Sequence, residues 1–281
     1  MIWQWNSLNN HGKNNETKSK IMINRRTFIL HGVTTVATLA LASNAEASSP
    51  KVSSISGYDY RLPQFEKGSR LLFQGDSITD MKWGRNQTDR NHYLGHSYVY
   101  LIAARLGVDM PQAQLEFFNR GISGNKVGDL RKRWREDAIE MKPDWLSILI
   151  GINDVEKTVT KENGFDLWED NYRFILDESL KANPELKLVL LNPFVLASGR
   201  LANLNAFKAK REIVDRLCMI VSQLAIDYNA VHVKTDEIFD EAARKVNAQQ
   251  WIWDGIHPLP QGHELIARNW LQAVSKATNT K

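Results

Sequence analysis

The sequence predicts an α/β fold: a five-stranded parallel sheet with helices on both of its faces. Apolar runs of strand length alternate with amphipathic stretches of helical length, an order typical of parallel strands joined by crossover helices. The apolar runs are nearly continuous, as expected for strands that are covered on both faces. A length of 281 residues with 43% hydrophobic content is enough for one sizeable core.

Five segments have the composition of buried strands, because branched and aromatic residues dominate them and turn residues follow them. They are "RLLFQ" (70–74), "LEFFNR" (115–120), "WLSILIG" (145–151), "LKLVLLNPF" (186–194) and "AVHVKTD" (230–236). Helical spacing of apolar residues predicts helices in "YVYLIAARLG" (98–107), "NYRFILDESLKA" (171–182) and "KREIVDRLCMIVSQLA" (210–225). We predict one domain over residues 69–281, preceded by a lead-in without periodicity at 48–68.

Residues 1–47 are predicted to be an export signal. The adjacent Arg25 and Arg26, a moderately apolar stretch and the small-residue end at 45–47 follow one another, as in a signal peptide. The arginine pair is typical of the twin-arginine route, and Met22 is a second candidate for the start of translation. The apolar stretch is too short and too rich in threonine for a membrane span. We therefore expect a periplasmic or secreted protein.

The basic charge of the chain lies mostly in this leader. Residues 1–47 contain five basic and two acidic side chains, which leaves a net charge of only +1 for the remainder. No basic field remains that would attract nucleic acid or anionic lipid, and we exclude both as partners. The single cysteine cannot form an internal disulfide. A homo-oligomer is compatible with the sequence, which does not define the oligomeric state.

Polar and glycine residues follow the predicted strands, at the sheet edge where α/β proteins bind their ligands. The four blocks are "GDS" (75–77), "GISGN" (121–125), "GIND" (151–154) and, near the C-terminus, "DGIHP" (254–258). Together they offer a hydroxyl, a glycine amide, a side-chain amide and an Asp/His pair. These groups are the components of an acyl-transfer site, namely a nucleophile, oxyanion donors, a base and a residue that orients the base.

Each residue type suits one step of ester hydrolysis. The Ser77 hydroxyl needs a base to take its proton, and the His257 imidazole can do so. Asp254 lies three residues before His257, so a single turn can place its carboxylate on the other ring nitrogen and fix the tautomer. The backbone N–H groups of Ser77 and Gly124 and the side-chain amide of Asn153 could hold the oxyanion.

The four blocks, in this order, resemble those of the GDSL, or SGNH, hydrolase superfamily. Over roughly residues 70–271, stretches such as "LLFQGDSITD" and "WDGIHPLPQGHELIAR" are similar to its bacterial acetylxylan esterase branch. The resemblance implies a flavodoxin-like three-layer α/β/α sandwich, a Ser77–His257–Asp254 triad and an oxyanion hole of Ser77, Gly124 and Asn153. It also implies a substrate that is an acetylated carbohydrate, such as a xylan-derived oligosaccharide, or another small ester. The segment after Phe194, "VLASGRLANLNAF" (195–207), is the least similar and could shape substrate choice.

Other functions stay open on the sequence alone. The same residues could serve a lysophospholipase or an acyl-thioesterase, and the fold could also belong to a non-catalytic carbohydrate-binding protein. Trp83, Trp251 and Trp253 lie close to the motifs, either as core residues or as an apolar wall for a sugar ring. His92 and His96 are spaced by four but lack an accompanying carboxylate or cysteine set. We therefore predict neither a metal site nor an organic cofactor.

Overall fold

A parallel sheet forms the centre of the computed structural model, which describes residues 61–155 and 159–280. The strands are β1 (Arg70–Gly75), β2 (Glu116–Asn119), β3 (Trp145–Leu149), β4 (Lys187–Leu191) and β5 (Val231–Val233). Their order in the sheet is β2-β1-β3-β4-β5, and each pair of neighbours is parallel. This is the strand order of flavodoxin-like proteins. The predicted fold class is confirmed, and each strand overlaps its predicted segment.

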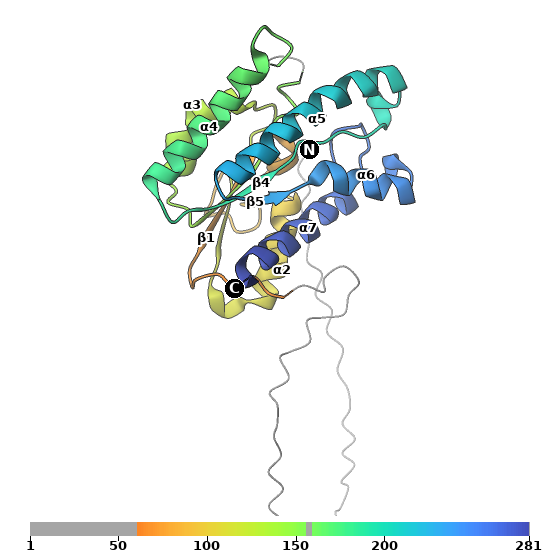
Figure 1. Cartoon of the computed structure of the whole chain (residues 1–281). Helices are drawn as coiled ribbons and strands as arrows, with labels where there is room; N and C mark the ends of the chain where they lie inside the picture. The colour runs from red at the N-terminus through yellow and green to blue at the C-terminus, as the bar shows by residue number, and fades with distance from the viewer. Residues whose placement is uncertain (1–60, 156–158, 281) are drawn as a thin grey trace, which may run out of the picture. The chain divides into compact units, whose positions relative to one another are not determined.

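Helices cover the sheet on both faces (Figure 1). The α-helices are α1 (Ser77–Asp80), α2 (Tyr98–Asp109), α3 (Val127–Trp134), α4 (Gly164–Ala182), α5 (Leu204–Asp227), α6 (Thr235–Lys245) and α7 (Pro260–Asn279). Short helical turns are η1 (Pro111–Ala113), η2 (Arg135–Ile139), η3 (Gly199–Leu201) and η4 (Ala248–Gln250). Helices α3, α4 and α5 pack in one layer, and α2, α6 and α7 pack in the other. Among the helices described here, none is both long enough and apolar enough to cross a bilayer.

Local capping sets the start of the longest helix. The Asn203 side chain accepts hydrogen bonds from the backbone N–H groups of Asn205 and Ala206, so α5 begins at Leu204. An asparagine at this position satisfies donors that the first turn of a helix would otherwise leave unpaired. The apolar periodicity alone predicts a start at residue 210. The additional turns extend α5 along the segment that follows β4.

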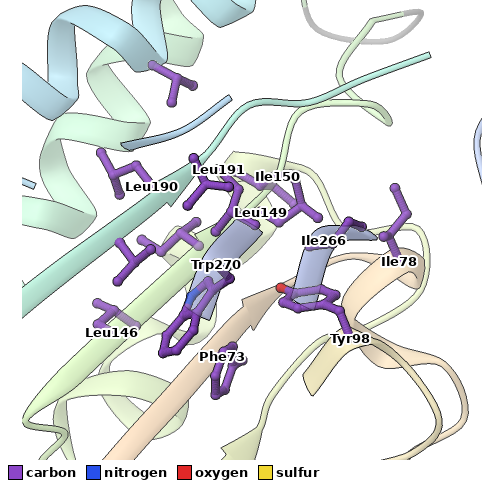
Figure 2. Close-up of a cluster of buried hydrophobic side chains, with 14 of the residues drawn as sticks. Phe73, Ile78, Tyr98, Leu146, Leu149, Ile150, Leu190, Leu191, Ile266 and Trp270 are labelled. Carbon is purple, nitrogen blue, oxygen red and sulfur yellow. The ribbon is translucent and has the colours of Figure 1, made fainter. Parts of the chain in front are cut away.

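The core joins the strands to the C-terminal helix. Trp270 of α7 is fully buried, and its ring lies 5.6 Å from that of Phe73 in β1. Its indole N–H donates to the Ser147 hydroxyl of β3 over 3.1 Å, which satisfies the one polar group of the side chain. Figure 2 shows leucines of β3 and β4 in the same cluster. Because α7 directly follows the 254–258 block, this packing fixes that block relative to the carboxyl ends of the strands.

The predicted N-terminal regions lie largely outside the described residues. This applies to the whole export signal at 1–47 and to the lead-in as far as residue 60. The described end of the lead-in, 61–68, contains no helix or strand, yet it packs on the domain. Phe65 meets the Trp145 ring edge-on at 5.2 Å, and the Leu62 carbonyl accepts a hydrogen bond from the Asn279 amide at the end of α7.

Candidate active site

Ser77 is the first residue of α1, directly after β1. The Asp76 carboxylate caps this short helix by accepting a hydrogen bond from the Ile78 N–H over 3.0 Å. Gly75 permits the close approach of its neighbours, because a Cβ at this position would lie 2.3 Å from Thr79 Oγ1 and 2.6 Å from the Leu149 carbonyl oxygen. The turn therefore presents the Ser77 side chain, which is partly exposed, at the carboxyl edge of the sheet.

Three predicted site residues are joined in a chain of hydrogen bonds. Ser77 Oγ lies 2.9 Å from His257 Nε2, although 180 residues separate the two in sequence. His257 Nδ1 lies 2.8 Å from Asp254 Oδ2. A carboxylate on Nδ1 favours the tautomer that carries its proton there, so Nε2 is left to accept the serine proton. The arrangement can therefore convert the Ser77 hydroxyl into a nucleophile.

The Asp254 carboxylate is held in its ionised form. Its Oδ1 accepts hydrogen bonds from the backbone N–H groups of Ile256 and His257, over 3.0 and 2.7 Å. Burial acts to raise the pKa of Asp254, but the hydrogen bonds from His257 and Ile256 outweigh it, so the pKa lies below its usual value. A permanent negative charge beside the imidazole can stabilise the imidazolium that forms when His257 takes a proton.

Gly124 and Asn153 lie beside one cleft, as the strand-end argument predicts. Gly124 has a φ of +83°, a left-handed conformation that favours glycine. In the described part of the chain, neither its N–H nor that of Ser77 donates to a protein acceptor. Asn153 Nδ2 donates to the Asn125 carbonyl over 3.1 Å, and an amide nitrogen carries a second proton. Three donors are thus available for an oxyanion.

Asp80 connects α1 to the glycine turn at 121–124, a role for which the sequence carries no signal. Its Oδ2 accepts from the Ser123 N–H over 2.9 Å, from the Ser123 hydroxyl over 2.6 Å and from Arg85 Nη2 over 2.7 Å. Burial acts to raise the pKa of Asp80, but Arg85 and Ser123 lower it more, which keeps the carboxylate charged. This buried carboxylate fixes the position of Gly124, which follows Ser123, relative to Ser77.

Of the two interpretations of Trp83 that the sequence leaves open, the structure favours a core residue over an apolar wall for a sugar ring. Only 5% of Trp83 is exposed, and the guanidinium groups of Arg85 and Arg120 lie 4.8 and 5.1 Å from its ring centroid. Its indole N–H donates to the Gly121 carbonyl over 2.8 Å, so Trp83 braces the glycine turn. A sugar ring has no open face of this indole on which to stack.

The other two tryptophans differ from each other. Trp251 is half-buried against the core, and its indole N–H donates to the Ala242 carbonyl over 3.2 Å. This placement favours packing over substrate contact. Trp253 is 55% exposed and directly precedes Asp254, so it alone of the three presents a large aromatic surface to solvent beside the site.

Among the described residues, His92 and His96 belong to no cluster of side chains that could hold a metal ion. His92 Nδ1 lies 3.0 Å from Asp89 Oδ2 on the surface. No group of three or more His, Cys, Asp or Glu side chains in the described ranges is placed to hold a metal ion. That this protein works without a metal or an organic cofactor stays a prediction.

Asp76 should make the stability of the protein depend on pH. Burial raises the pKa of Asp76 to about 7; the hydrogen bond from Ile78 opposes this rise, and the charge of Asp154 adds to it. An aspartate in the unfolded chain has a pKa of about 3.9. Between about pH 4 and pH 7, the folded state therefore holds a proton that the unfolded state has released. The free energy of unfolding should fall as the pH rises through this window.

The variant Asp76→Asn should remove this contribution, because an amide does not ionise. The measurement is denaturant unfolding of both proteins at several pH values from 4 to 8. Other groups titrate in both proteins and cancel in the difference, including His263, whose pKa burial lowers to about 3. We expect the variant to gain stability relative to the parent as the pH rises. A difference that does not change with pH would show that Asp76 is ionised in the folded state.

The sequence is similar to proteins of one enzyme family. A model of the GDSL-like Lipase/Acylhydrolase family matches residues 73–265. An acetylxylan esterase from Geobacillus stearothermophilus is 34% identical over 215 residues, which cover 74% of this chain and 94% of that protein.

Solved structures extend the likeness to the fold. Axe2, an acetylxylan esterase from Geobacillus stearothermophilus, superposes with a TM-score of 0.61 at 32% identity, covering 74% of this chain and 95% of that one. LAE5, an α/β hydrolase from the metagenome of Lake Arreo, Spain, gives a TM-score of 0.62 at 31% identity, covering 77% and 99%. Two Axe2 variants described as catalytic mutants replace a serine and an aspartate with alanine.

Proposed function

This chain belongs to the GDSL-like lipase/acylhydrolase family and is an esterase, and we propose that it removes acetyl groups from carbohydrates such as xylan-derived oligosaccharides. The observation that carries the proposal is the hydrogen-bonded chain from Ser77 through His257 to Asp254. The likeness to an acetylxylan esterase supports the choice of an acetyl ester on a sugar. Export of the protein stays a prediction, because the signal lies outside the described residues.

In the proposed reaction, Ser77 Oγ attacks the carbonyl carbon of the ester while His257 Nε2 takes the hydroxyl proton. Asp254 stabilises the resulting imidazolium. The N–H groups of Ser77 and Gly124 and the Asn153 amide donate to the oxygen that becomes negative. His257 then passes its proton to the departing sugar oxygen, which leaves an acetyl group on Ser77. A water molecule activated by His257 releases acetate and restores the serine.

The Axe2 variants support the assignment of two of these residues. The residues replaced in the catalytic mutants of that protein are a serine and an aspartate, the same types as Ser77 and Asp254. The two positions stand nearly as far apart in that chain as Ser77 and Asp254 stand here.

A chain-length series of 4-nitrophenyl esters separates the proposed function from lysophospholipid or acyl-thioester hydrolysis. We expect kcat/KM to be highest for the acetate and to fall towards the octanoate. The cleft beside Gly124 and Asn153 combines apolar residues with Arg200 and Lys210, whereas a long acyl chain needs a continuous apolar surface. Ser77→Ala, assayed with each ester, provides the background rate. A maximum at octanoate or longer would reject the acetylesterase and favour the alternative.

A further inference from the structure

The segment that follows β4 (195–207) is the part of the domain that least resembles the superfamily. It packs on the loop that carries Asp254. The Leu196 N–H donates to the Gly255 carbonyl over 3.1 Å, and the Ser198 hydroxyl donates to the Ile252 carbonyl. Ser198 is only 3% exposed. These bonds tie the turn before η3 to the triad-acid loop on both sides of Asp254.

Gly199 brings the two backbones into direct contact. It has a φ of +48°, and a Cβ at this position would lie 2.4 Å from the Trp253 carbonyl and 2.5 Å from Asp254 Cα. No other residue could occupy this position without moving the loop. The next residue, Arg200, therefore leaves the backbone at a fixed point beside the triad.

Arg200 extends along the cleft next to the oxyanion donors. Its Nη2 lies 3.3 Å from Asp254 Oδ2, while 58% of its side chain is exposed. The cleft has a volume of about 700 Å³, and Arg200 lines it together with Gly124, Asn153 and Ile256. Lys210 from α5 lines it too, and no acidic side chain occurs among the described residues of the lining. Arg200 therefore brings a half-exposed positive charge to the cleft wall.

The contact with Asp254 does not by itself account for an arginine at position 200, because Asp254 is held in place without it. Two backbone N–H groups and the His257 ring already fix the carboxylate. An ion pair whose arginine is more than half exposed adds little to stability. Its one contact also engages a single terminal nitrogen, whereas a guanidinium has five N–H donors in a planar fork that matches a carboxylate.

We propose that Arg200 forms an anion subsite for the alcohol part of the substrate, so that the enzyme prefers acetyl esters of saccharides carrying a carboxylate. This inference rests on the proposed acetylesterase function and adds the class of sugar: one with a uronic acid unit near the acetyl group. The carboxylate binds the exposed N–H groups of Arg200 while the ester carbonyl lies at Ser77.

The test compares acetate release from two acetylated xylo-oligosaccharides that differ only in a uronic acid branch. The wild-type enzyme should show a higher kcat/KM for the acidic substrate, and added salt should reduce the preference. Arg200→Gln should lower the ratio of acidic to neutral kcat/KM by about tenfold or more. Arg216→Gln is the matched control, because Arg216 is an exposed arginine on α5 that lies outside the cleft lining. It should keep the wild-type ratio.

Three results would overturn the proposal. An equal loss with both substrates in Arg200→Gln would show that Arg200 only positions Asp254. Unchanged kcat/KM values for both substrates would show that Arg200 does not recognise the substrate. A third arm uses acetylglycerol phosphate, which presents a phosphate instead of a carboxylate. If this ester exceeds the acidic saccharide and its advantage depends on Arg200, the saccharide assignment is rejected.

A second measurement separates this proposal from the proposed function. Glucuronate and xylose are compared as competitive inhibitors of 4-nitrophenyl acetate hydrolysis, a reaction that requires no saccharide substrate. We expect glucuronate to inhibit the wild-type enzyme at least tenfold more strongly than xylose, and Arg200→Gln to lose most of this difference. Equal inhibition by the two sugars would contradict the anion subsite, even in an enzyme that deacetylates saccharides.

Discussion

Ser77→Ala should lower kcat for 4-nitrophenyl acetate by about 10⁴-fold or more, because the hydroxyl that would form the acetyl-enzyme is gone. The Ser77 side chain is partly exposed and bonds to His257 alone among the described side chains. Its removal should therefore leave the melting temperature almost unchanged. Steady-state kinetics and a thermal melt on the same preparation measure both effects.

Covalent labelling provides the control for this variant. A serine-directed organophosphate should add its mass to Ser77 in the wild-type enzyme and to no residue in Ser77→Ala. A folded variant that keeps wild-type turnover would place the nucleophile elsewhere, as would mass on another serine.

Asn153→Ala should lower kcat by about 10²–10³-fold with little change in KM. An oxyanion donor meets the substrate oxygen best when negative charge develops, so its loss acts on the transition state. The structure also shows Asn153 donating to the Asn125 carbonyl. Loss of that single bond should cost about 1 kcal/mol of stability, which a thermal melt will detect.

Asp154→Asn is the matched control, because Asp154 is the next residue and has no place in the proposed chemistry. Asp154 is fully buried, and its Oδ2 accepts from the Val127 N–H over 3.2 Å. This variant should therefore change the melting temperature more than kcat. If Asn153→Ala melts early but retains its kcat, Asn153 is a structural residue and the oxyanion assignment fails.

The sheet and the strand-end blocks could be predicted because their signals are local. Each strand is a continuous apolar run, and the residues after it face the same edge once the strands are parallel. The Asp254–His257 contact also follows from a spacing of three. The contact between His257 and Ser77 could be predicted only from the expected parallel-sheet fold, since 180 residues separate the two in sequence.

The remaining contacts depend on segments that meet only in the folded protein. Proximity to the motifs leaves both a core role and a sugar-binding role open for Trp83, but Arg120, which lies far along the chain, covers its ring. Asp80, which lies outside the four blocks, joins the first block to the second through the side chain of Ser123. Arg200 reaches Asp254 from a segment without any sequence signature.

Acetate release from acetylated xylo-oligosaccharides is the measurement that tests the proposed function most directly. Wild-type protein and Ser77→Ala are incubated at equal concentration with the same substrate, and free acetate is measured over time. We expect the wild-type enzyme to release acetate continuously and the variant to remain at the background rate. Wild-type protein that hydrolyses long-chain or thioester substrates but frees no acetate from the sugars would contradict the account, as would equal release by Ser77→Ala.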